Sequence, residues 1–194
     1  MIDKHSLDLV PPGTKPRVVL FLLGVALPLL ITVAAALWDQ AGSGAELAAG
    51  AEGSHHWLVV GGVMAFVVLL WTLLQLAMKR HRLELDRAQL RVATTFYTRT
   101  VPLSELLLDK ARVIELEERP EFKPGLKSNG YALPGFQSGH FQLRNGDRAF
   151  VAIAGERRAL WLPTASGKGL LLQPHQPDAL LERLRELAQA QRRR

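Results

Sequence analysis

The chain has 194 residues, a formal net charge of +6 and no cysteine. The missing cysteine excludes disulfides, thiolate nucleophiles and cysteine-based metal sites. Two long apolar runs without a charged side chain exclude a wholly soluble chain, and roughly 115 residues remain after them, which is close to the usual size of one domain.

The two apolar runs predict a transmembrane helical hairpin. They cover residues 18–38 and 57–78, and each exceeds the roughly 20 helical residues that span a hydrocarbon core. We therefore assign residues 1–80 to an N-terminal segment and hairpin, and residues 81–194 to a separate domain. A cleaved signal peptide is the alternative for the first run, because residues 34–36 resemble a small-residue cleavage site.

Charged residues around the two runs predict their orientation. Lys and Arg flank the outer ends of the hairpin, whereas the connection 39–56 has three acidic residues and neither Lys nor Arg. Short loops rich in Lys and Arg stay in the cytoplasm. We therefore expect a multi-pass protein of the inner membrane with both termini in the cytoplasm. Lys79, Arg80 and Arg82 are candidate contacts for anionic lipid headgroups.

From residue 81 onward, short β-type stretches alternate with turn residues. The stretches 83–85 and 90–97 flank a turn at 86–88 and predict a hairpin. Asn145-Gly146 lies between two alternating runs and is the strongest short-range hairpin signal in the chain. The other expected strands cover residues 98–101, 111–116, 140–144, 148–153, 158–162 and 169–172.

Two remaining segments have other patterns. Residues 117–139 contain three prolines and four glycines, so we expect this segment to be irregular. Residues 177–194 are expected to form a helix, because Leu180, Leu184 and Leu187 recur at helical spacing and give one apolar stripe. One stripe predicts one buried face, packed against the sheet.

Residues 128–146 read SNGYALPGFQSGHFQLRNG. This run resembles the signature N-G-x-x-L-P-G-x-x-x-G-x-F-x-L-x-N-G of bacterial pleckstrin-homology (PH) domains in small membrane proteins. A VPLSEL segment at 101–106 and a PTASG segment at 163–167 follow the order found in that family. The resemblance implies a mainly-β PH-like fold with about seven antiparallel strands and a C-terminal capping helix.

Residues 127–139 of this irregular segment are also the expected contact site for a partner, because loops on a rigid scaffold concentrate binding residues. The candidate partner-binding residues are Asn129, Gly130, Tyr131, Leu133, Pro134 and Phe136. Two alternatives stay open: the glycines serve tight turns, and the apolar side chains fold inward. We expect a membrane-anchored interaction module that binds a protein or a second copy of itself, or alternatively a sensor of anionic headgroups.

No pattern indicates an enzyme. Gly167-Lys168 resembles the end of a phosphate loop, but Leu162 replaces the required glycine. His140 and His175 have no neighbouring nucleophile and acid. We therefore expect no catalytic residue, no metal, no cofactor, no small-molecule substrate and no nucleic-acid partner. The first hairpin also lacks the Lys-x-Arg run with which eukaryotic PH domains hold phosphoinositides.

Overall fold

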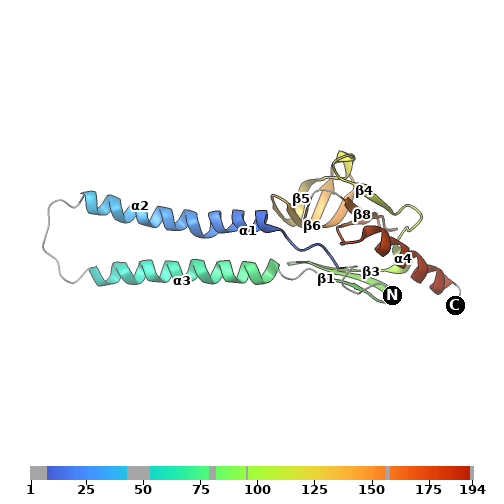
Figure 1. Ribbon diagram of the computed structural model, residues 1–194, viewed down its shortest axis with the longest axis horizontal. Coiled ribbons are helices and arrows are strands. Elements are labelled where there is room, and N and C mark those ends of the chain that lie inside the picture. Colours follow the sequence, from blue (N-terminus) through green and yellow to red (C-terminus); the bar gives the residue numbers. More distant parts are fainter. Residues whose placement is uncertain (1–7, 43–52, 79–81, 95, 156–157, 193–194) are drawn as a thin grey trace. The chain divides into compact units, whose positions relative to one another are not determined.

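The computed structural model describes residues 8–42, 53–78, 82–94, 96–155 and 158–192. Contacts group the chain into two compact units. One unit is Arg17–Leu76, and the other joins Met1–Pro16 to Ala77–Arg194. The first is a helical hairpin and the second is a β domain that carries one long helix (Figure 1).

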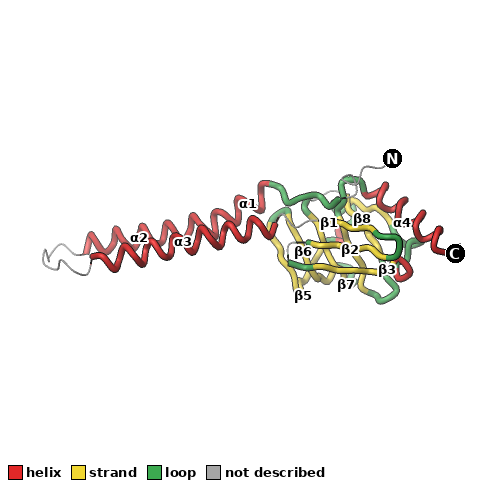
Figure 2. Tube along the Cα trace, turned by 90° about the horizontal axis from the view of Figure 1, so that it is seen from below, coloured by secondary structure: helices red, strands yellow, loops and turns green. Residues whose placement is uncertain are grey.

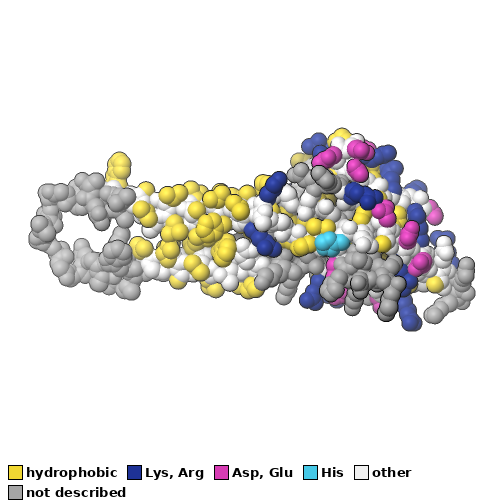
Figure 3. Space-filling view, viewed as in Figure 1, with side chains coloured by type: hydrophobic (Ala, Val, Ile, Leu, Met, Phe, Trp, Pro, Cys, Tyr) yellow, Lys and Arg dark blue, Asp and Glu magenta, His cyan; other side chains and the backbone are white. Residues whose placement is uncertain are grey.

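The hairpin unit consists of apolar helices that run side by side (Figure 1). Its elements are α1 (Thr14–Phe21), a π-helical turn (Leu22–Ala26), α2 (Leu27–Gly42) and α3 (Gly53–Met78). Among the described residues, one segment is long and apolar enough to cross a membrane, Thr14–Ala35, and α3 contributes a shorter apolar stretch, Val60–Leu73. Figure 3 shows apolar side chains gathered along both helices.

The π-helical turn lies just before Pro28. Proline has no backbone N–H, so the carbonyl of Gly24 loses its usual helical donor. The chain widens here, and the N–H of Leu27 donates to the carbonyl of Leu22, five residues back. Further along, the hydroxyl of Thr32 donates to the carbonyl of Pro28 at 2.8 Å.

The β domain contains two sheets that pack on each other (Figure 2). The first is a meander of β1 (Arg82–Leu85), β2 (Gln89–Ala93) and β3 (Thr98–Pro102). The second has the order β4-β8-β9-β7-β6-β5, with strands Arg112–Glu115, Pro124–Leu133, Phe136–Leu143, Arg148–Ile153, Arg158–Leu162 and Lys168–Leu172 for β4 to β9. Helix α4 (Pro177–Arg192) closes the domain.

The mainly-β architecture with a C-terminal helix agrees with the sequence analysis, but two details differ. The described residues form nine strands instead of about seven. One pair, β7 with β9, is parallel, because the β8–β9 hairpin returns β9 to the edge of β7. Strand β2 ends at Ala93 and β3 begins at Thr98, and between them the N–H of Thr94 donates to the carbonyl of Tyr97 at 2.8 Å.

The expectation that residues 117–139 are irregular is wrong. Most of the segment forms β5 and the start of β6, paired across a turn at Pro134-Gly135. Gly130 and Gly139 are direct partners, and a Cβ on Gly139 would lie 2.5 Å from the Cα of Gly130. The glycines therefore allow two strands to approach closely, and Pro124 stands at the first position of its strand, where proline is tolerated.

Two hydrophobic clusters occupy opposite faces of the six-stranded sheet. Successive side chains of a strand point to opposite faces, so Phe150 and Ala152 of β7 face the first cluster while Val151 and Ile153 face the second. The first cluster lies between the two sheets and includes Leu180 and Leu184 of α4, both fully buried, with Leu187 packed at its margin. The predicted leucine stripe of the C-terminal helix is confirmed.

Residues ahead of the first apolar helix belong to the β domain. Leu9 forms an isolated antiparallel bridge with Pro174 and is buried in the first cluster. The N–H of Val10 donates to the carbonyl of Gln173 at 2.9 Å, and the N–H of His175 donates to the carbonyl of Asp8 at 3.0 Å. No local pattern in the sequence indicates this pairing. The pairing attaches the segment before the hairpin to the β domain, which follows the hairpin in the chain.

Candidate functional site

The six predicted partner-binding residues lie on β5, its turn and the start of β6, and they differ in exposure. Asn129 and Pro134 are exposed, Gly130 and Leu133 are half-buried, and Phe136 is 1% exposed. Phe136 is therefore covered by the protein itself, as in the alternative that apolar side chains fold inward. The exposed members remain available to a partner.

Aromatic rings gather beside the β5–β6 turn. The ring of Tyr131 lies edge-on to Phe96 at 6.2 Å and to Phe136 at 6.1 Å between centroids. Burial raises the pKa of Tyr131, and its hydroxyl has no hydrogen-bond partner among the described groups. Phe96 is 56% exposed. The three rings thus form a continuous cluster, in which Tyr131 lies between the buried Phe136 and the exposed Phe96.

Strand β5 is an edge of the six-stranded sheet. In the described part of the chain, only β6 pairs with it. Its side chains are largely exposed, and Leu126 reaches 73%. No acidic residue occurs between Glu121 and Asp147, whereas Lys123 and Lys127 do. The strand therefore presents an exposed, basic edge, with register shifts between Pro124 and Asn129.

The three candidate headgroup contacts are only partly covered by the structure. Lys79 and Arg80 lie outside the described residues. Arg82 is exposed and begins β1, opposite Ala93.

A cavity of about 250 Å³ opens at one end of the space between the two sheets. Four basic side chains line it, each from a different strand, and we call it the cationic cavity: Arg99 of β3, His140 of β6, Arg148 of β7 and Lys168 of β9. Ser128 and Gln142 add a hydroxyl and an amide, and no acidic side chain lines the cavity. Register places Arg148 directly beside Lys168.

The cations in the cavity affect one another. The guanidinium of Arg99 donates to the backbone carbonyl of Lys168 at 3.2 Å. Burial lowers the pKa of Arg99, and nearby Glu105 opposes this shift. Burial also lowers the pKa of His140, and the positive charges of Arg99 and Lys168 lower it further. A neutral imidazole is therefore favoured at this position.

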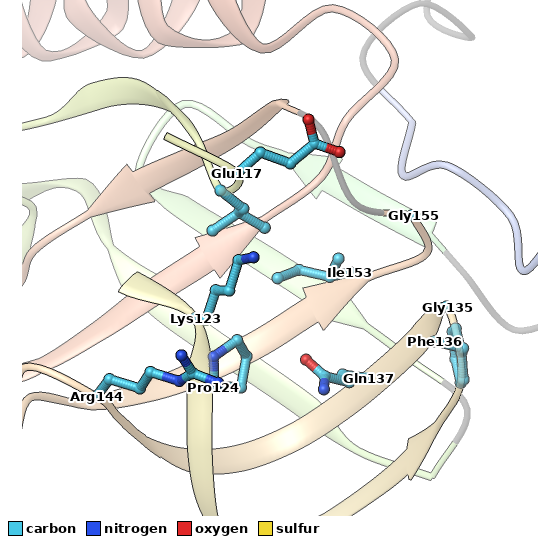
Figure 4. Close-up of a pocket in the computed structure, with 10 residues that line it drawn as sticks. Glu117, Lys123, Pro124, Gly135, Phe136, Gln137, Arg144, Ile153 and Gly155 are labelled. Carbon is cyan, nitrogen blue, oxygen red and sulfur yellow. The ribbon is translucent and has the colours of Figure 1, made fainter. Parts of the chain in front are cut away.

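A second cavity, of about 230 Å³, is lined by Phe136 and Gln137 at the start of β6, Ile153 at the end of β7 and Arg144 just after β6. Figure 4 shows Lys123 and Arg144 on one side of it and Glu117 on another. This mixture of both signs contains no nucleophile with an adjacent base, the arrangement that covalent catalysis requires. The described residues contain no group of three or more His, Asp or Glu able to hold a metal ion.

No sequence pattern predicted the cationic cavity. His140 and Lys168 occur in separate local patterns, which were weighed as parts of an enzyme site and of a phosphate loop, and Arg99 and Arg148 belong to no functional motif. One local signal existed: Arg99 is two residues from Val101, so it shares the face of β3 that points inward. The positions of His140, Arg148 and Lys168 depend on the register in which β6, β7 and β9 pair.

Comparison with known proteins supplies one finding. The family model described as a bacterial PH domain matches residues 81–188, which include both sheets and most of α4. Neither the search of curated proteins nor that of solved structures gave a match. Domains of this family are generally non-catalytic interaction modules.

Proposed function

Because the chain belongs to the bacterial PH domain family, we propose that it is a membrane-anchored interaction module whose β domain binds a protein partner at the cytoplasmic surface of the inner membrane. The observation that carries the proposal is the pairing of residues 8–10 with residues 173–175. Residues that precede the apolar hairpin in the chain and residues that follow it thus belong to the same β domain.

The pairing bears on how many times the chain crosses the membrane. Leu9 precedes the candidate span Thr14–Ala35, and its partner Pro174 lies in the β domain beyond α3. Two segments that pair must share a compartment, so the chain between them crosses an even number of times. Helix α3, with 26 residues, supplies the second crossing. Signal-peptide cleavage after the first run would remove Leu9 from the core that it fills.

The distribution of charge supports a cytoplasmic location for the β domain. Lys15 and Arg17 lie at the start of the first helix, and Lys79, Arg80 and Arg82 follow α3. Lys and Arg near the ends of membrane spans favour the cytoplasmic side. Two crossings and this charge pattern together support a topology with both termini in the cytoplasm.

Cysteine labelling tests the topology, and the chain has no native cysteine to interfere. We expect an impermeant thiol reagent to modify Ser43→Cys in intact cells, and to modify Ser166→Cys only after the membrane is opened. The opposite pattern would overturn the proposed orientation. Labelling of both residues in intact cells would overturn a cytoplasmic β domain.

The exposed edge of β5 is the proposed docking surface, and its occupant is an extended, acidic segment of another protein. An edge strand offers unpaired N–H and C=O groups to an added strand. Strand addition best fits Asn129–Leu133, where the pairing with β6 is regular, because bulges interrupt it on the other side of Asn129. A second copy of this chain would bring Lys127 near an equally basic strand, and like charges repel.

Crosslinking of the full-length chain in native membranes tests this surface. With a photo-crosslinking residue in place of Ala132, we expect capture of an acidic partner segment, reduced several-fold by Lys127→Glu. The matched control Lys110→Glu lies outside β5 and should leave capture unchanged. Capture of a second copy of this chain would contradict the proposal. So would an equal reduction of capture by Lys127→Glu and by Lys110→Glu.

Tyr131→Ala and Phe136→Ala separate a docking role from a packing role. Phe136 is buried, so its loss should destabilise the β domain by about 3–5 kcal/mol. Tyr131 is only half-buried and its hydroxyl is unpartnered, so its loss should reduce capture with a smaller effect on stability. Capture that survives Tyr131→Ala in the folded protein would remove Tyr131 from the proposed surface.

Contact with anionic headgroups through Lys79, Arg80 and Arg82 is a second proposal, supported by the exposure of Arg82 four positions after the last residue of α3. Each basic residue near an anionic surface contributes about 1 kcal/mol. Such contacts weaken with salt, since the Debye length is about 8 Å at physiological ionic strength. Docking of an acidic segment also weakens with salt, so Arg82→Glu separates the two contacts: Arg82 lies on β1, and its reversal should weaken headgroup attraction while leaving partner capture at β5 unchanged.

A further inference from the structure

We propose that the cationic cavity is a binding site for a phosphate-bearing anion. The proposal goes beyond the protein interaction above, because the cations of the cavity, Arg99, Arg148 and Lys168, lie on β3, β7 and β9, whereas the docking surface is the edge of β5. It also differs from the headgroup contacts at Arg82, which does not line the cavity.

The cavity is a polar continuation of the hydrophobic core. On β3, Arg99 lies two residues from Val101, which is buried between the sheets. On the facing sheet, Arg148 of β7 pairs with Lys168 of β9. Two residues further along the same strands, Phe150 pairs with Leu170, and both are fully buried. The same strand faces that form the core thus end in charged side chains that point toward one space.

Among the described residues, two of the charges in this space have no ion-pair partner. Elsewhere in the described chain, Arg91, Arg119, Arg158 and Arg183 each form an ion pair with a carboxylate. In the cavity, Arg148 and Lys168 form none with any described residue, and Glu105 is the acid whose charge acts on Arg99. Positive charges gathered without carboxylates raise the local concentration of anions.

The donor groups suit phosphate oxygens. A guanidinium presents a planar fork of N–H groups that matches phosphate, and an ammonium adds a point charge. Arg148 and Lys168 make no hydrogen bond through their side chains to another described group, and the Ser128 hydroxyl is likewise without such a partner. Their hydrogen-bonding capacity is therefore available to a ligand.

The size and walls of the cavity limit what it accepts. At about 250 Å³ it is smaller than the roughly 300–1,000 Å³ of pockets for drug-sized ligands. The ring of His140 is edge-on to Tyr97 at 6.3 Å and to Phe150 at 5.3 Å, and Phe141 is buried. The volume of the cavity therefore suits a small phosphate group rather than a nucleotide.

Binding is tested with the full-length chain in a neutral detergent. Inorganic phosphate is added at constant ionic strength, with chloride as the reference anion, and thermal unfolding is followed. We expect phosphate to raise the melting temperature of the parent. Arg148→Gln and Lys168→Gln should each weaken the apparent affinity about tenfold or more, about 1.4 kcal/mol. The matched controls Arg185→Gln and Lys110→Gln do not line the cavity and should bind phosphate as the parent does.

A second experiment distinguishes a lipid headgroup from a free phosphate. The chain is placed in phosphatidylcholine nanodiscs that contain either phosphatidic acid, a phosphate monoester, or phosphatidylglycerol, a diester. Amide hydrogen exchange is then read in residues 138–150 and 164–170. Protection by phosphatidic acid alone supports a lipid headgroup, and protection only by dissolved phosphate supports a soluble ligand. If neither phosphatidic acid nor dissolved phosphate protects these residues, the proposed site is contradicted. Equal losses of phosphate affinity in the cavity variants and in their controls would contradict it as well.

Discussion

The space between the two sheets has an apolar end and a charged end, and the same strands form both. Strand β7 begins with exposed Arg148 and continues into five buried residues, and β9 begins with exposed Lys168 and continues into four. The apolar end removes Leu170, Leu172 and Leu184 from water completely. Burial of such side chains contributes roughly 1.5–3 kcal/mol each, whereas exposed charges contribute little to stability.

This contrast separates stability from recognition within one sandwich. Backbone pairing is continuous through both ends, since Arg148 pairs with Lys168 as regularly as Phe150 pairs with Leu170. The side chains alone decide what each end does. The apolar end holds the sheets and α4 together, and the charged end brings Arg99, Arg148 and Lys168 to one cavity.

The largest expected effect is at the apolar end. Leu184→Ala should destabilise the β domain by about 2–5 kcal/mol, because Leu184 is fully buried between α4 and the sheets. Denaturant unfolding of the full-length chain in neutral detergent measures the change. Leu187→Ala, at the margin of the same cluster, should cost less. If Leu184→Ala and Leu187→Ala lower the free energy of unfolding equally, the two leucines of α4 are buried to the same extent.

An intermediate effect is expected at His140 of the charged end. Its pKa in the folded protein is lowered below the ordinary 6.5 by burial, Arg99 and Lys168. The unfolded state therefore binds more protons between the folded pKa and 6.5, so stability falls as the pH decreases through this window. His140→Gln should remove this part of the pH dependence of the melting temperature. An unchanged slope would show that other groups cause it.

Phosphate should alter the same pH dependence. A bound anion near His140 favours the protonated imidazole, so saturating phosphate should reduce the loss of stability below pH 6.5. Melting curves recorded with phosphate and with chloride at equal ionic strength measure the difference. A loss of stability that is the same with both anions would place the ligand away from His140.

The smallest expected effect has the opposite sign to that of Leu184→Ala. Lys168→Gln removes one of several like charges, so it should raise the free energy of unfolding by less than about 1 kcal/mol at low salt. The gain should disappear at high salt, where the repulsion is screened. Lys110→Gln is the control, since Lys110 lies outside the cavity. A destabilising effect of Lys168→Gln would show that its ammonium supports the fold.

Features encoded by neighbouring residues were predicted correctly. The Asn145-Gly146 turn joins β6 to β7 in the expected hairpin, with the N–H of Gly146 donating to the carbonyl of Leu143 at 3.0 Å. The spacing of Leu180 and Leu184 identified the buried face of α4. Turn chemistry and helical periodicity act over a few residues, so a single sequence contains them in full.

Composition was misleading where a residue served a distant partner. The prolines and glycines of residues 117–139 predicted an irregular segment, yet Gly130 permits close approach to Gly139 in a strand pair. Leu9 precedes a long apolar helix and gave no local sign that it bridges to Pro174. In both cases the structural role depends on a partner elsewhere in the chain.

The sequence by itself determined the apolar runs, the distribution of charge around them, most of the strand positions and the PH-like character of the domain, because all of these follow from local patterns. Only the tertiary structure decided that Arg99, His140, Arg148 and Lys168 share one cavity. Their convergence depends on the register of four strands and on the way two sheets face each other. Such long-range pairing is set by the packing of the whole domain, which no short segment specifies.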